Sequence, residues 1–71
     1  MRGYMKEIRE ISKKRQEDMA RKLCISESYY NQIERGERQR KMDIDLIQKL
    51  AECLNVSIEY IIEEENKLKE L

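Results

Sequence analysis

Four polar side chains recur at helical intervals near the middle of the chain, and their groups suit specific hydrogen bonding. They are Glu27, Ser28, Asn31 and Gln32. Residues three and four apart share one face of a helix, so a carboxylate, a hydroxyl and two amides would lie together. Such groups can pair with base edges in the major groove of DNA, where each base pair shows a distinct donor and acceptor pattern. Because polar residues also cover any solvated helix face, the pattern alone leaves both interpretations open.

Two short helices joined by a tight turn are expected to position this face, over residues 16–23 and 27–35. Ser26 suits the N-cap of the second helix because its hydroxyl can accept from backbone amides of the first turn, and Gly36 suits a left-handed residue after its end. Apolar residues mark the inward faces of the two helices: Met19, Ala20 and Leu23, then Tyr30 and Ile33. A helix, a three-residue turn and a second helix form the helix-turn-helix motif.

The 71 residues are expected to form a single compact all-α domain, because no segment alternates apolar and polar residues as a half-buried strand does. Three further helices are predicted, over residues 4–13, 44–54 and 58 to about 69. The core of the domain would cover about residues 5–62, with a C-terminal helical extension over 63–71. A chain this short has a modest core, which favours oligomerisation.

Capping residues support the two C-terminal helices. Asp43 and Ser57 suit their N-caps, and Asn55 suits the end of the fourth helix. In the last helix, two pairs have the favourable i,i+4 order of acid before base: Glu63 with Lys67, and Glu65 with Lys69. These pairs predict an exposed C-terminal end.

The net charge of zero hides an uneven distribution. Residues 1–41 carry twelve Lys and Arg against seven Asp and Glu, a balance of +5, whereas residues 42–71 carry three against eight, a balance of −5. The basic part contains the whole helix-turn-helix, as expected for a surface that faces phosphates. The loop that follows adds Arg38, Arg40 and Lys41, which can reach a phosphate backbone beside a groove. A solvated connection carries such charges too, so that alternative stays open.

Catalysis, metal binding and a cofactor are not expected. The chain has no histidine, the usual general base near neutral pH, and its carboxylates share helical patterns with Lys and Arg, as surface pairs do. Cys24 and Cys53 are far apart without CxxC spacing, so they form no zinc motif and are expected to be small, mostly buried residues. A redox-sensing thiol or an intermolecular disulfide is the alternative.

No membrane segment, secretion signal or small-molecule site is indicated. No apolar run is long enough to cross a bilayer, and the start of the chain lacks the apolar stretch of a signal peptide. The sequence therefore predicts a cytoplasmic protein.

The order of residues also resembles that of a known family. The matching segments are Gln16-Glu17-Asp18-Met19-Ala20, Leu23, Ile25-Ser26, Ser28-Tyr29, Ile33-Glu34-Arg35-Gly36-Glu37-Arg38, Leu50-Ala51, Leu54-Asn55-Val56-Ser57 and Ile58. On these residues the chain resembles the Cro/C1-type helix-turn-helix proteins, also called the XRE family, from about Met5 to Ile62.

The resemblance implies a compact five-helix, lambda-repressor-like DNA-binding domain whose third helix lies in the major groove of double-stranded DNA. It also implies a homodimer that places two such helices about one DNA turn apart on a palindromic operator. Glu34 is expected to hold the local structure without reading bases. The residues expected to contact bases are Glu27, Ser28, Asn31 and Gln32. Those expected to contact phosphates are Gln16, Tyr29, Arg35, Arg38, Arg40 and Lys41.

Five residues depart from the pattern of the family. Lys14 replaces an apolar residue, Arg15 replaces the Ser or Thr that caps the second helix, and Met42 replaces a frequent Pro. Cys24 replaces the Gly of the turn, so a residue with a side chain is expected to adopt a positive φ at modest cost. Glu27 would repel phosphate unless it accepts from a cytosine amino group, which predicts a preference for C·G pairs.

Two functions from different classes remain. The first is a sequence-specific transcriptional regulator, expected to be a repressor because no second domain is present to bind an effector. Its homodimer would join through the fourth and fifth helices, where Ile61, Leu68 and Leu71 could form a short seam interrupted by Glu65. The second is a protein-interaction module of the same fold, antitoxin-like or antirepressor-like, which the zero net charge and the acidic last helix favour.

Overall fold

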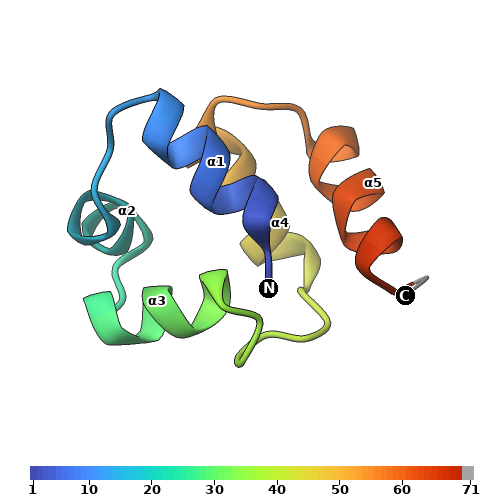
Figure 1. Cartoon of the computed structure of the whole chain (residues 1–71), viewed down its shortest axis with the longest axis horizontal. Helices are drawn as coiled ribbons and strands as arrows, with labels where there is room; N and C mark the ends of the chain where they lie inside the picture. Colours follow the sequence, from blue (N-terminus) through green and yellow to red (C-terminus); the bar gives the residue numbers. More distant parts are fainter. Residues whose placement is uncertain (70–71) are drawn as a thin grey trace.

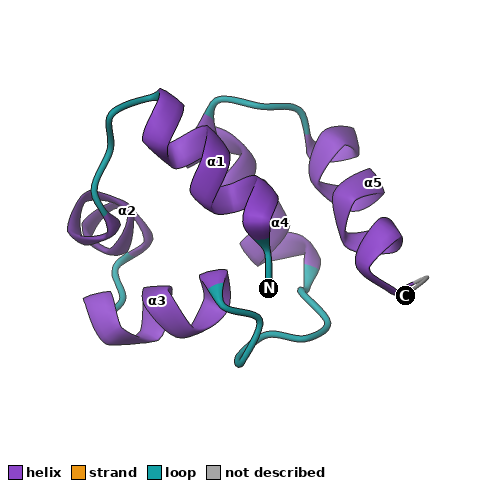
Figure 2. Cartoon of the chain, viewed as in Figure 1, coloured by secondary structure: helices purple, strands orange, loops and turns teal. Residues whose placement is uncertain are grey.

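The computed structural model describes residues 1–69, which form five α-helices and no strands (Figure 2). The helices are α1 (Gly3–Ile11), α2 (Gln16–Leu23), α3 (Glu27–Glu34), α4 (Ile44–Leu54) and α5 (Ile58–Lys69). In Figure 1, α1 crosses the middle of the molecule in front of α4, with α2 and α3 on one side and α5 on the other. The predicted all-α fold with a helix-turn-helix at α2 and α3 is confirmed.

Every helix contributes to a single apolar core. α2 packs most extensively on α3, as the predicted inward faces of these two helices require. The apolar side chains with no solvent exposure are Met5 of α1, Met19 of α2, Tyr30 and Ile33 of α3, Leu50 of α4 and Ile61 of α5. Each such burial stabilises the fold by about 1.5–3 kcal/mol relative to an exposed side chain.

A buried ion pair joins α1 to α3. Arg9 is 8% exposed and Glu34 is 2% exposed. The guanidinium donates through Nε to Oε2 of Glu34 at 2.9 Å and through Nη2 to Oε1 at 3.2 Å. The hydrogen bond to Glu34 raises the pKa of Arg9, and burial raises the pKa of neighbouring Tyr30. Glu34 therefore has the structural role expected for it.

The same backbone motif ends α1, α2, α3 and α4. A residue with positive φ follows each helix, and two amide hydrogen bonds run back to the last turn, as in a Schellman motif. The four residues are Lys13 (φ 58°), Cys24 (φ 59°), Gly36 (φ 79°) and Asn55 (φ 58°). The positive φ predicted for Cys24 is confirmed. The left-handed residue at Lys13 explains why α1 ends at Ile11, two residues before the predicted end.

Side-chain hydrogen bonds fix the starts of α2, α3, α4 and α5. The Oγ of Ser26 accepts from the Tyr29 amide at 3.0 Å at the start of α3. In the same way, the carboxylate of Asp43 and the hydroxyl of Ser57 accept from backbone amides in the first turns of α4 and α5. At α2, Arg15 offers no side-chain acceptor, but its own amide donates to the Asp18 carboxylate at 2.9 Å. The start of α2 is thus fixed by one half of a capping box.

The two cysteines differ in exposure. Cys53 is buried in the core, as predicted, and burial raises the pKa of its thiol. Cys24 is exposed, so the prediction of a buried residue was wrong there. Cys24 follows the last residue of α2 in a left-handed conformation, so it does not belong to the inward face of that helix.

The contacts of α5 differ from those predicted. Lys67 pairs with Glu64 at 2.9 Å rather than with Glu63, and Glu65 binds Arg2 at 2.9 Å rather than Lys69. The predicted dimer seam through Ile61 is also wrong, because Ile61 is fully buried in its own core. The exposed large apolar side chains of α5 are Ile58, Ile62 and Leu68, and Leu71 lies outside the described residues.

Replacing Cys24 by glycine should stabilise the protein. Glycine adopts positive φ without the steric cost of a Cβ, so Cys24→Gly should raise the free energy of unfolding by about 0.5–1 kcal/mol. Urea denaturation under reducing conditions measures this difference. The control is Lys22→Gly inside α2, where glycine should lower stability by about 1 kcal/mol. A loss of stability in Cys24→Gly would contradict the strain at this turn.

Candidate nucleic-acid interface

α3 and the loop after it form one continuous edge of the molecule, at the bottom of the view in Figure 1. Glu27 and Ser28 are exposed in the first turn of α3, and Asn31 and Gln32 are half-buried one turn later. Tyr30 and Ile33, on the opposite side of the helix, point into the core. The structure thus places all four predicted base-contact residues at the surface of one helix.

Gln32 is held in one orientation by the loop. Nε of Arg38 donates to Oε1 of Gln32 at 3.0 Å. Because a guanidinium carries only donors, the amide oxygen must face Arg38, and the NH₂ group of Gln32 is directed elsewhere. The oxygen keeps a second lone pair. Gln32 can therefore offer two N–H donors and one acceptor site to a partner.

Gln16 joins the start of α2 to α3. Its Nε2 donates to Oδ1 of Asn31 at 3.2 Å and to Oε1 of Glu34 at 3.3 Å. A carboxylate only accepts, so the NH₂ of Gln16 must face Glu34, and both of its hydrogens then have acceptors. A phosphate contact through this side chain requires one of these bonds to change partner. The backbone amides in the first turn of α2 can bind an anion without that change.

One basic side chain near this site was missed by the sequence analysis. Lys6 of α1 lines the same surface hollow of about 400 Å³ as Gln16, Asn31 and Arg35. Lys6 lies ten residues before Gln16 in the sequence and carries no motif of its own. Only the packing of α1 against α3 brings this cation beside the predicted contact residues.

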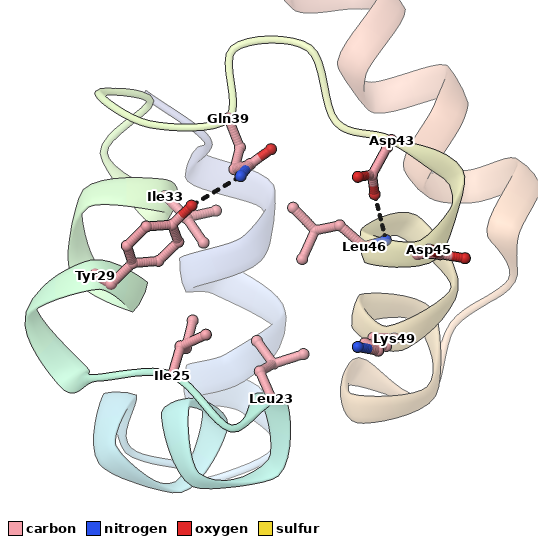
Figure 3. A pocket seen from close by; sticks show the side chains of 9 residues that line it. All are labelled: Leu23, Ile25, Tyr29, Ile33, Gln39, Asp43, Asp45, Leu46 and Lys49. Carbon is pink, nitrogen blue, oxygen red and sulfur yellow. Dashed lines mark hydrogen bonds between the residues drawn. The ribbon is translucent and has the colours of Figure 1, made fainter.

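Tyr29 lies at the edge of a groove between α3 and the start of α4 (Figure 3). Its hydroxyl accepts from Nε2 of Gln39 at 2.8 Å. A hydroxyl that accepts one hydrogen bond can still donate its own hydrogen, so Tyr29 can bind a phosphate oxygen. The groove has a volume of about 310 Å³, with Ile25 and Leu46 among its apolar lining residues and Lys49 among its charged ones.

The predicted phosphate-contacting cations are all accessible. Arg35, Arg38, Arg40 and Lys41 are exposed along the end of α3 and the following loop. Arg35 lies 3.5 Å from Glu37. The side chain of Arg35 is 60% exposed and that of Glu37 is 51% exposed, so water screens this ion pair strongly. Exposed cations beside a polar helix face can fix the position of a DNA backbone without reading its sequence.

Comparisons with known proteins bear on the same segment. A family model described as helix-turn-helix matches residues 5–61, well over half of the chain. No curated protein sequence and no solved structure matches the chain. Within residues 1–69, no helix has the length and apolar character needed to cross a membrane. In the same residues, no three potential metal-binding side chains gather into a cluster.

Proposed function

The chain belongs to the Cro/C1-type (XRE) helix-turn-helix family, and on this premise we propose that it is a sequence-specific repressor acting as a homodimer on a palindromic operator. Members of this family bind DNA and regulate transcription, and the family is not a catalytic one. The observation that carries the proposal is the edge formed by α3 and its loop, where oriented polar groups lie beside exposed cations. The protein would act in the cytoplasm.

Base reading is assigned to Glu27, Ser28, Asn31 and Gln32. The NH₂ group of Gln32 suits acceptors such as N7 and O6 of guanine or N7 of adenine, and its oxygen can accept from an adenine amino group. The Glu27 carboxylate would accept from the amino group of cytosine. This combination supports discrimination between base pairs rather than attraction to DNA in general.

Backbone binding is assigned to six residues around the reading helix. Cations at the end of α3 supply charge, and the start of α2 supplies amides. The six residues are Gln16, Tyr29, Arg35, Arg38, Arg40 and Lys41. Their contacts would fix the register of α3 in the groove.

The homodimer would form through α4 and α5. Four large apolar side chains of these helices remain accessible: Ile44 at 72%, Ile58 at 38%, Ile62 at 42% and Leu68 at 37% exposure. Covering them in a dimer would add apolar burial to a small core. Two copies of α3 about 34 Å apart would then occupy successive major grooves and block a promoter.

Selection of bound duplexes from a random DNA library at low salt tests this proposal. We expect enrichment of a palindrome whose half-site centres lie about 10 base pairs apart. Enrichment of a single half-site would contradict the dimer. Absence of enrichment would refute sequence reading and favour the protein-interaction alternative, which the acidic surface of α5 would then serve.

Gln32→Ala should reduce specificity. Loss of the amide should weaken binding to the selected site by about 1–3 kcal/mol and leave binding to unrelated DNA nearly unchanged. Titrations on both duplexes measure the difference. Ser12→Ala, at an exposed position just after α1, is the control and should bind both as the wild type does. Equal losses on both duplexes would remove the reading role of Gln32.

Arg38→Ala should instead weaken binding to every sequence. Loss of one phosphate contact should reduce the slope of log affinity against log salt by about one. Titrations over a range of salt concentrations give this slope. Lys67→Ala, which removes one exposed charge from α5, should leave it unchanged. An unchanged slope in Arg38→Ala would place Arg38 away from the DNA backbone.

A further inference from the structure

Arg2 is buried where three distant segments of the chain meet. Its side chain is 3% exposed, and Nε donates to both carboxylate oxygens of Glu65, at 3.1 and 2.9 Å. Nη1 donates to the backbone carbonyls of Ile33 at 2.7 Å and of Arg38 at 3.0 Å, and Nη2 donates to the carbonyl of Gln39. One guanidinium therefore binds α5, the end of α3 and the loop after it.

The loop takes its shape around this guanidinium. Gln39 has a φ of 55°, and the carbonyls of Arg38 and Gln39 converge on Arg2. A planar guanidinium with five donors can bind a carboxylate and several carbonyls at once, whereas an ammonium cannot match this fork geometry. The backbone amide of Arg2 also donates to the carbonyl of Glu34 at 2.9 Å, which fixes the start of the chain against α3.

The loop held in this way carries predicted DNA contacts. The carbonyl of Arg38 binds Arg2, while its side chain binds the amide of Gln32. Arg40 lies two residues further along. A shift of this backbone segment would therefore move a phosphate-contacting cation and release a base-reading amide together.

Glu65 makes the position of the loop depend on α5. Its carboxylate is 12% exposed and also accepts from the Tyr4 hydroxyl at 2.6 Å. Removing the carboxylate partner of a buried cation strongly destabilises the fold. Arg2 thus requires α5 to be packed in place, and α5 is one of the two helices assigned to the dimer.

We propose that Arg2 is a positioning residue for DNA binding, which holds the loop of residues 36–41 in its binding conformation and couples it to α5 through Glu65. The proposal rests on the DNA-binding function above. Arg2 acts through Arg38 and Gln32 and touches no DNA itself, since its side chain is enclosed.

Arg2→Lys and Glu65→Gln test this role. Lysine keeps the charge but loses the fork, and glutamine keeps oxygen and shape but loses the charge. In both variants, hydrogen exchange should accelerate at the amides of Glu37 and Arg38, which donate to the Gln32 carbonyl at 2.9 and 3.3 Å. Affinity for the selected duplex should fall roughly fivefold at low salt, with a shallower salt slope, at temperatures where circular dichroism shows an intact fold. Glu63→Gln, at an exposed position of α5, is the matched control.

A double-mutant cycle separates positioning from general stabilisation. If Arg2 acts through Arg38, Arg2→Lys should cost little further affinity in an Arg38→Ala background. Additive losses would overturn the proposal, as would wild-type exchange rates and affinity in both single variants. If the wild-type chain enriches no duplex, the proposed function fails, and with it the role of Arg2 in DNA binding. The exchange rates of the two amides still decide whether Arg2 holds the loop.

Discussion

The position of α3, the second helix of the motif, depends on one buried carboxylate. Glu34 accepts from Arg9 of α1 and from Gln16 of α2 while belonging to α3 itself, so the three helices meet at a single charged group. Removing one partner of a buried ion pair typically costs about 3–5 kcal/mol. That is comparable with the lower end of the stability of a whole small domain. The position of α3 against α1 therefore depends on this pair as well as on apolar packing.

Around this centre, the polar groups at the surface are ordered before any ligand binds. Asn31 and Gln32 each have their amide oxygen bound by a neighbouring donor, from Gln16 and Arg38 respectively. Side chains that are already fixed lose less conformational entropy when they bind a partner. The proposed interface thus combines amides in fixed orientations with a loop whose cations remain exposed.

The basic and acidic segments of the chain form different parts of the folded protein. The basic segment contains the predicted DNA-binding edge, and the acidic segment supplies α4 and α5. Arg2 and Glu65 connect the two parts through a part-buried pair 63 residues apart in sequence. Opposite charges of the two parts therefore contribute to the fold through this pair.

The sequence by itself determined the helices and the surface position of the candidate site, because these depend on interactions between residues close together in the chain. The order of the residues also identified the family. Apolar spacing, the caps at Ser26 and Asp43 and the left-handed turn at Cys24 each involve residues within a few positions. Only the tertiary structure decided the partners of Glu65, the burial of Ile61 in its own core and the place of Lys6 beside Gln16. The i,i+4 rule predicted Lys69 for Glu65, but an exposed pair contributes little, whereas the enclosed guanidinium of Arg2 needs a carboxylate. The partner of a buried side chain depends on which distant groups are buried beside it, and this follows from packing rather than from spacing along the chain.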